Sequence, residues 1–561
     1  MGSINNILGI AKLAMMAQQT AIQVTAHNIA NVNTKGYSRQ EVVFEETTPL
    51  NWNPGQIGTG VNAAAILRKY DSFIEGQITD NRESYGNLDI QRYALTNIEN
   101  LFYDSYGAGI DNLLNDFFSA MQDLSANPSG TPERVALLSK ADALADAINN
   151  IYSDLFQLQK DMNNQVNQTI NDINSITEQI ADLNVKISQA ETAGHNANDY
   201  RDMRGKLMND LAELVDIQYF EDNTGQVTII GGGTALLVER GNSWDLGTEI
   251  NSDNNDYYNI IYNPGGNNSV DLTNNITNGK LKGLITIRDT TLNEIIDDID
   301  RLAASVANEI NQVHRGGFGL DGSTDNDFFT PSFKTGDPVS VTGFSTNSGT
   351  GDVSVTIIDP TLLTYHNYEL TFSANGSDTI YTITNKTTNV STSGTYTTIP
   401  PTSPTFQGLT FNITGTHDPG DKYTVSAHKD AAKNLQVAIS TDETYKIAAA
   451  MQAVDNGEDN RNILTLVGLQ DKLSVDGTST FNGYYSSVVG EIGANSQYVN
   501  NSSMAQKFSL EQLDNMRESV SGVSMDEEMA NLMKYQNAYE AAARLITVSD
   551  ELLQTLLNIL G

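Results

Sequence analysis

The feature that most limits how this chain can fold is a long stretch without glycine or proline, residues 133–193. Thr131 can cap its start and Pro132 suits the first helical turn. A helix of about 90 Å, at ~1.5 Å per residue, must bury its apolar stripe against other long helices. Residues 284–314 and 484–520 have the spacing to be these partners. The stripe consists of Leu138, Ala141, Ala145, Ile148, Tyr152, Leu155, Met162, Val166, Ile173, Ile176, Ile180, Leu183 and Ile187, with Gln159 and Thr169 as polar exceptions.

Both ends of the chain have the same three-and-four spacing, which predicts helices over residues 4–30 and 525–560. We expect the two helices to form a coiled coil and to present assembly interfaces. In the first helix the seam is Ile4, Leu8, Ala11, Met15, Ile22 and Ile29, interrupted by Gln18 and Thr25. In the last helix it is Met529, Leu532, Tyr539, Ala543, Ile546, Leu553, Leu557 and Leu560, interrupted by Gln536 and Asp550.

Two regions have strand-like patterns instead. Residues 219–279 are rich in Gly, Asn and Asp around short apolar runs, and in 331–429 Val353, Val355 and Ile357 alternate with Ser and Thr. Tyr368, Leu370 and Phe372 alternate in the same way before a turn at Asn375-Gly376. The predicted fold class is mostly α with β insertions, an α+β multidomain protein. Its expected parts are paired terminal helices (1–45 and 521–561) as an inner coiled-coil domain, a long-helix bundle (46–330 and 431–520) with a small β excursion near 219–279, and an inserted outer all-β domain (331–430).

Charge and composition exclude several functions. The chain has 32 basic and 69 acidic residues, a net charge of -37, and no cysteine. Such a charge repels nucleic acid and anionic membranes, and the lack of cysteine excludes disulfides and thiolate chemistry. No apolar stretch of about 18 residues is present to span a membrane. The longest apolar run near the start, residues 13–17, is too short for a cleavable signal peptide, so export would use another route.

No residue pattern predicts catalysis, a cofactor or a metal. None of His27, His195, His314, His366, His417 and His428 has a partner at metal-binding helical spacing, and His314 is expected to contact the carbonyls that end its helix. Residues 231–233 are three glycines without the Lys-Ser/Thr of a phosphate loop, which favours a tight turn. Asp321, Asp325 and Asp327 could hold calcium, but their spacing favours a solvated turn. We therefore expect a protein that is not an enzyme.

A short polar segment follows the first helix and contains Asn28, Asn31, Gly36, Tyr37 and Arg39. On physical grounds alone it is a helix exit into a turn. It resembles the signature of the flagellar axial family, and residues 521–532 with Tyr535, Gln536 and Tyr539 resemble the hook-associated protein 1 family within it. Further resemblance lies in residues 199–217, 279–284, 311–329 and 460–497, is faint over 219–278 and is absent over 331–429.

The resemblance implies a structural subunit of the bacterial flagellum that forms the junction between hook and filament and allows filament assembly. Implied partners are other copies of the chain in a ring or tube, the hook protein, a second hook-filament junction protein, and a cytosolic export chaperone at the C-terminal helix. The implied location is the extracellular flagellum, reached by type III export through the flagellar apparatus. Each terminal helix buries few apolar side chains, at ~1.5–3 kcal/mol each, against about 1–2 kcal/mol of backbone entropy per residue. Both ends are thus expected to be mobile in the free subunit and to order on assembly.

Two other interpretations remain at this stage. The hook protein of the same axial family shares the N-terminal signature and a two-ended coiled coil. A secreted carbohydrate-binding or hydrolytic protein on a helical stalk would place its site in the β domain instead.

Overall fold

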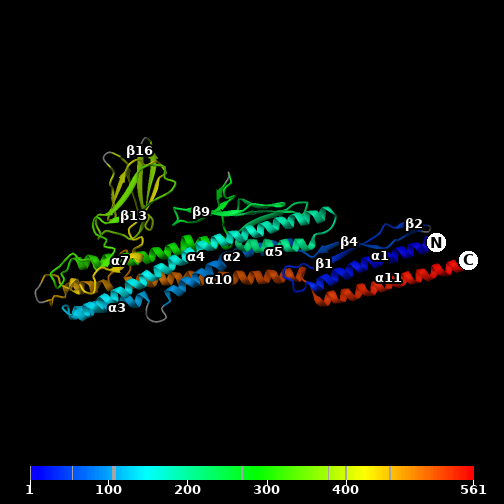
Figure 1. Ribbon diagram of the computed structural model, residues 1–561, viewed down its shortest axis with the longest axis horizontal. Coiled ribbons are helices and arrows are strands. Elements are labelled where there is room, and N and C mark those ends of the chain that lie inside the picture. The colour runs from blue at the N-terminus through cyan, green and yellow to red at the C-terminus, as the bar shows by residue number, and fades with distance from the viewer. Residues whose placement is uncertain are drawn as a thin grey trace.

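The computed structural model describes residues 2–52, 55–103, 109–266, 269–376, 378–398, 401–453 and 457–560. The molecule is elongated, with both termini at one end, long helices along its length, and a β domain projecting sideways near the other end (Figure 1). The predicted α+β multidomain class is confirmed, since long helices and several antiparallel sheets alternate along the chain.

At the end that carries the termini, α1 (Gly2–Ala30) and α11 (Met525–Leu560) lie side by side (Figure 1). Both helices were predicted to within two residues. A hairpin of β1 (Gln40–Glu46) and β4 (Val61–Arg68) packs on α1 and is prolonged by β2 (Leu50–Trp52) and β3 (Gly55–Ile57). The expected domain boundary at residue 45 therefore falls inside this hairpin, and the helical body begins only after Arg68.

The body is built around α4 (Thr131–Thr192), whose 62 residues span about 93 Å at ~1.5 Å per residue. Every residue of the predicted stripe is buried except Ile176, which is half-buried. The expected cap is wrong, because Gly130 occupies that position and Thr131 is already helical. The surrounding helices are α2 (Ser72–Phe102), α3 (Ile110–Ala126), α5 (Asn198–Leu214), α6 (Gly279–Thr286), α7 (Leu292–Arg315), α9 (Arg461–Val467) and α10 (Phe481–Ser521).

The partner helix predicted over residues 284–314 is present but contains a π-helical segment, Ile287–Thr291, between α6 and α7. In this segment Arg288 is fully buried, pairs with Asp289, and donates to the Asn163 side chain and the Tyr258 carbonyl. Gln159, a polar exception in the α4 stripe, donates to the Arg288 carbonyl. This exception in the stripe thus binds the polar π segment, and α4 stays packed there.

A small β region covers one side of α4. It has a four-stranded sheet of β5 (Ile217–Glu221), β6 (Val227–Gly231), β7 (Ala235–Glu239) and β8 (Asn242–Ser243), and a three-stranded sheet of β9 (Leu246–Asn251), β10 (Tyr257–Tyr262) and β11 (Val270–Asp271). Gly232 and Gly233, with φ of 53° and 69°, make the turn between β6 and β7. The prediction of a tight turn there is confirmed.

The projecting β domain is one antiparallel sheet in the order β17-β16-β15-β20-β13-β14-β19-β18. Its strands are β13 (Pro338–Gly343), β14 (Asp352–Ile357), β15 (Asn367–Asn375), β16 (Asp378–Asn385), β17 (Ser391–Thr395), β18 (Thr405–Phe406), β19 (Leu409–Thr414) and β20 (Lys422–Ser426). The alternating residues predicted in β14 and β15 all point into its core.

The chain enters and leaves the β domain at one place. Short strands β12 (Phe329–Thr330) and β21 (Gln436–Val437) pair with each other where the chain leaves and re-enters the helices. The single-turn helix α8 (Ala431–Asn434) follows the domain, and Asp300 of α7 accepts hydrogen bonds from the backbone of Asp430 and Ala432. Burial raises the pKa of Asp300 to about 8.

Candidate functional site

The signature segment folds back after α1 and joins three parts of the molecule. Asn28 is buried, and its side-chain oxygen accepts from the Tyr37 hydroxyl at 2.7 Å and from the Gln40 N–H at 3.0 Å. Its amide donates to the Gln40 carbonyl at 2.9 Å and to Glu528 at 3.1 Å. Gly36 makes the turn with a φ of 87°, a conformation that favours glycine. One asparagine therefore holds the returning chain against both α1 and α11.

Arg39 secures the same loop to the start of α11. Its guanidinium pairs with Glu527 at 2.7 Å and with the buried Glu528 at 2.8 Å, and its N–H donates to the Ser521 carbonyl. Burial, with the nearby carboxylates Asp199, Asp202 and Glu528, raises the pKa of Tyr37, so the phenol stays protonated and can donate to Asn28.

Ser38 fastens the loop to the body. Its N–H and its hydroxyl both donate to Asp202 of α5, at 2.7 and 2.8 Å, and Arg68 at the end of β4 pairs with the same carboxylate at 2.9 Å. Burial raises the pKa of Asp202 although these donors oppose the shift. The terminal helices, the hairpin and the body thus meet at a hydrogen-bonded joint.

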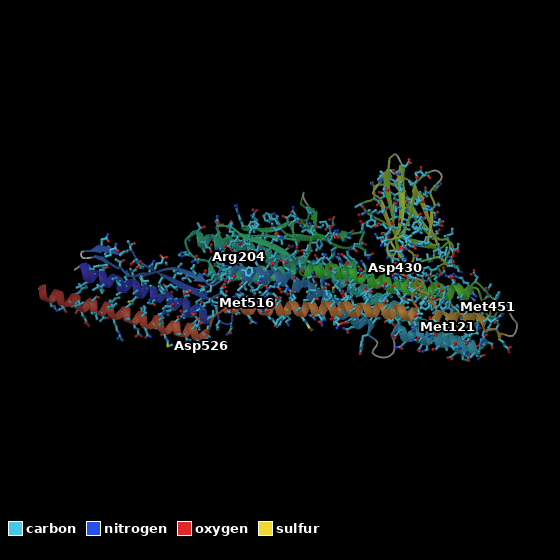
Figure 2. All side chains as sticks on the ribbon, turned by 180° about the vertical axis from the view of Figure 1, so that it is seen from behind. Met121, Arg204, Asp430, Met451, Met516 and Asp526 are labelled. Carbon is cyan, nitrogen blue, oxygen red and sulfur yellow. The ribbon has the colours of Figure 1, made fainter. Side chains whose placement is uncertain are left out.

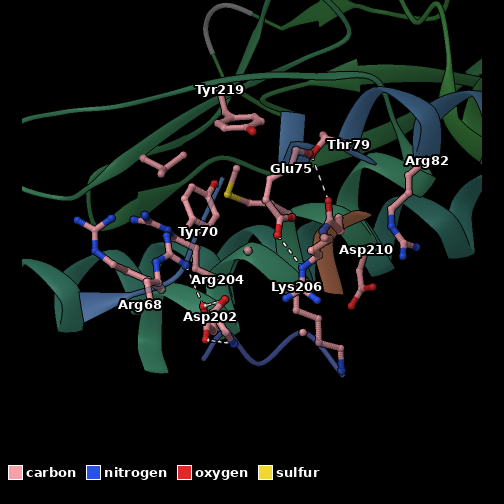
Figure 3. Close-up of a pocket in the computed structure, with 18 of the residues that line it drawn as sticks. Arg68, Tyr70, Glu75, Thr79, Arg82, Asp202, Arg204, Lys206, Asp210 and Tyr219 are labelled. Atoms are coloured by element: carbon pink, nitrogen blue, oxygen red, sulfur yellow. Dashed lines mark hydrogen bonds and ion pairs between the residues drawn. The ribbon is translucent and has the colours of Figure 1, made fainter. Parts of the chain in front are cut away.

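A cavity of about 140 Å³ lies beside this joint and is lined by charged side chains (Figure 3). Its arginines are nearly all paired: Arg68 with Asp202, Arg204 with Glu221 at 2.7 Å, and Arg517 of α10 with Glu75 of α2 at 2.7 Å. Burial lowers the pKa of Arg204 to about 10, still well above neutral. Paired ions of this kind hold the helices around the cavity in position.

The predicted seam of α1 is only partly buried within one chain. Ala11 is fully buried, and the other five residues of the seam are half-buried. The tightest contacts of α1 use smaller residues that the apolar count missed, because the hairpin lies close to the helix. They are Ala21 and Val24, which meet Val42, Phe44, Ala63 and Ile66 of the hairpin and Tyr535 of α11, and Ala17 is buried as well.

The predicted seam of α11 is still more open. Met529 is 47% exposed, and Leu532, Tyr539, Ala543, Ile546 and Leu553 are half-buried, while the side chains of Leu557 and Leu560 lie outside the described residues. The buried positions of α11 are Ala542, Ser549 and Glu528, which the pattern did not single out. Six large apolar side chains of this helix are at least 46% exposed: Met525, Met529, Met533, Leu545, Val548 and Leu552. We refer to these six residues as the open row.

The residues considered above for metal binding or catalysis make structural contacts instead. The described residues hold no cluster of three or more His, Cys, Asp or Glu arranged for a metal. Asp327 pairs with Arg315, and Asp321 accepts from the Ser323 N–H within its turn. The expected contact of His314 is wrong, because its ring bonds to the Asn326 carbonyl and the Ala448 N–H. The phenylalanines around it bury the ring, and burial lowers its pKa to about 4.

No helix in the described part of the chain is both long and apolar enough to span a membrane.

Comparison with known proteins yields three family models. The model for the flagellar hook-associated protein FlgK helical domain matches residues 95–329. The model for the flagellar basal body rod FlgEFG protein C-terminal region matches 517–559, and the model for flagella basal body rod proteins matches 8–37. The two end models cover the paired terminal helices and the first half of the signature loop.

Full-length relatives agree with these matches. Flagellar hook-associated protein 1 of Escherichia coli is 28% identical over 561 residues, covering 99% of this chain and all of the relative. The protein of the same name from Bacillus subtilis is 27% identical over 585 residues, covering 99% and 98%. The solved flagellar hook junction protein FlgK from Burkholderia pseudomallei shares the fold, with a TM-score of 0.69 at 20% identity over 79% of this chain and all of that one.

The fold, the joint and the end models define a structural protein of the flagellar axis, a class without enzymes. Within that class, the chain belongs to the family of flagellar hook-associated protein 1. The helical-domain model is the finding that separates this family from the hook protein, the nearer alternative.

Proposed function

We propose that this chain is the subunit that forms the junction between hook and filament and allows the filament to assemble. The observation that carries the proposal is the open row of α11, whose side chains are at least 46% exposed in the single chain although α11 lies beside α1. Large apolar side chains exposed in this number on one helix are typical of protein interfaces. Further copies of the chain, arranged as a ring or tube, would cover it.

The terminal helices serve in this proposal as the inner, interacting layer, and the β domain faces outward. Ile4, Leu8, Met15, Ile22 and Ile29 of α1, with the half-buried positions of α11, complete their burial against neighbouring copies. The neighbours along the axis are the hook protein on one side and a second hook-filament junction protein on the other. Before assembly, an export chaperone in the cytosol covers the open row.

The proposed location is the extracellular flagellum, reached through the flagellar export apparatus without a cleavable signal peptide. The proposed role is purely structural, without catalysis. Both chain ends are mobile in the free subunit and become ordered on assembly, because much of their apolar surface is buried only between copies. Amide exchange on the free subunit tests this: weak protection of residues 2–30 and 530–560 is expected, and strong protection would contradict it.

Deleting the gene tests the function directly. Cells without the chain should keep hooks but release filament subunits into the medium, and the wild-type gene should restore attached filaments. Attached filaments in the deletion strain would refute the proposal. A variant with Met525, Met529 and Met533 all changed to Ser should fail to restore attached filaments.

A further inference from the structure

A groove separate from the open row lies between the signature loop and the body. It has a volume of about 490 Å³ and is bordered by residues 34–37 of the loop and by the α5 residues Met203, Lys206 and Leu207. Met203 is 56% exposed although it lies in a largely apolar hollow. We call this feature the junction groove. Its walls suit an apolar side chain brought by another molecule.

The charges around the junction groove are unusual for so acidic a chain. Lys35 and Lys206 both line it, and neither makes an ion pair with any described residue. The carboxylates nearby are already engaged, since Asp202 pairs with Arg68 and Asp199 accepts from Gln40 at 2.7 Å. The groove therefore offers two unpaired cations beside an apolar hollow, although the chain carries a net charge of -37.

The start of α11 presents the complementary pattern. Met525 and Met529 are 46% and 47% exposed, and the spacing of four places them on one face of the helix. Asp526 lies next to them, is exposed, and makes no ion pair with the described residues, whereas Glu527 and Glu528 are both held by Arg39. The two methionines and the carboxylate of Asp526 are therefore complementary to the apolar junction groove and its two lysines.

These two surfaces are different patches of one chain, because Met525, Asp526 and Met529 are not among the residues that line the junction groove. When one patch of a copy binds a different patch of the next copy, the contact is heterologous, and each copy offers one patch to each neighbour. Repetition of such a contact generates a ring or a helical tube.

We propose that the start of α11, with Met525, Asp526 and Met529, docks into the junction groove of a neighbouring copy of this chain. The methionines enter the hollow beside Met203, and Asp526 pairs with Lys35 or Lys206. This proposal rests on the proposed function, because it supplies the lateral contact of the junction ring. It also gives the exposed Met203 and the two lysines a role that the single chain does not.

Cysteine cross-linking tests the contact cleanly, because the wild-type chain has no cysteine. A chain carrying both Met203→Cys and Met529→Cys is expressed in the deletion strain, and detached flagella are oxidised and separated under denaturing conditions. A ladder of dimers and longer multimers is expected. The matched control joins Met203→Cys to Met451→Cys, which is 44% exposed and lies at the far end of the molecule, and it should give no ladder (Figure 2).

Charge exchange provides a second measurement. Lys206→Glu should lower the affinity of each contact between neighbouring copies by about twofold to fivefold. Because one ring contains many such contacts, the losses multiply, and filament retention should fall. Adding Asp526→Lys to the same chain should restore retention, which a merely structural role of Lys206 would not produce. A chain with both cysteines that keeps filaments attached but stays monomeric on oxidation would overturn the groove proposal alone. Failure of the wild-type gene to restore filaments would instead refute the proposed function.

Discussion

Asn28 offers the sharpest test of how the signature loop works. Asn28→Ala removes the partner of the Tyr37 hydroxyl and of both backbone groups of Gln40, all of them buried. Each unpaired buried group costs about 1–3 kcal/mol, so the three groups together should cost the ordered joint about 3–9 kcal/mol of stability. At ~1.4 kcal/mol for each factor of ten, the ordered form becomes about 10²-fold to 10⁶-fold less populated.

Filament retention measures the effect on the assembled protein. In the deletion strain, the Asn28→Ala chain should reach the medium in wild-type amounts, since export requires no ordered joint. Few filaments should remain attached, because the loop no longer holds α1 to α11. Filament protein is quantified by immunoblot on cells and in the medium, with the exported chain measured in parallel.

Asn31→Ala is the matched control, because the same residue type lies three positions further along the same loop. Asn31 bonds only to neighbours within four residues, namely His27 and Thr34. Its loss should cost at most about 1 kcal/mol and leave filaments attached. Equal loss of filaments in the two variants, or wild-type retention with Asn28→Ala, would refute the assigned role of Asn28.

Three further predictions concern the body. Arg288→Met should lower the free energy of unfolding of the helical body by about 3 kcal/mol, because it removes the fully buried partner of Asp289. Arg92→Met, at an exposed pair, should change this free energy by less than about 1 kcal/mol, and calorimetry on the purified chain compares the two. Gly86→Ala should destabilise the body, because a Cβ there would lie 1.9 Å from a backbone oxygen of α5. At Gly76 in the same helix an added Cβ would contact no atom, so Gly76→Ala should raise helix stability by up to about 1 kcal/mol. Circular dichroism melts compare the two variants. The pKa of Asp300 is about 8 in the folded protein, against an ordinary value of 3.8, so its contribution to the free energy of unfolding is complete below pH 3.8 and is lost as the pH rises through 8. Asp300→Asn should remove this decline, which denaturant titrations at pH 5 and pH 8 measure.

Long-range apolar spacing made the helices predictable from sequence. The α4 stripe, α1 and α11 each repeat one spacing over many turns, and few alternatives bury such a stripe. The π segment in the partner helix could not be foreseen, because it depends on Arg288 reaching Asn163 of α4 and Tyr258 of β10. The burial of an arginine against residues distant in the chain cannot be inferred from the spacing of its sequence neighbours.

The terminal site was predicted less completely. Counting large apolar residues selected Leu8, Met15 and Ile22, but the closest packing in one chain uses Ala21, since small residues let the hairpin approach α1. The hairpin was missed because its second strand, β4, holds three alanines in a row and has weak alternation. The role of Asn28 required knowing that Glu528 lies beside it, although 500 positions separate the two residues in the chain.

The pairing of β12 with β21 has a wider consequence. The backbone leaves the helical body at Thr330 and returns at Gln436 as hydrogen-bonded neighbours, which are about 4.8 Å apart in a sheet. The chain between them is connected to the body through this single two-stranded stem, and side chains of α7 hold it as well, since Arg301 donates to the Tyr365 carbonyl and Asn308 to the Pro360 carbonyl. The strands away from these contacts can therefore be lengthened, shortened or exchanged without changing the helical body, and a foreign epitope can be grafted there.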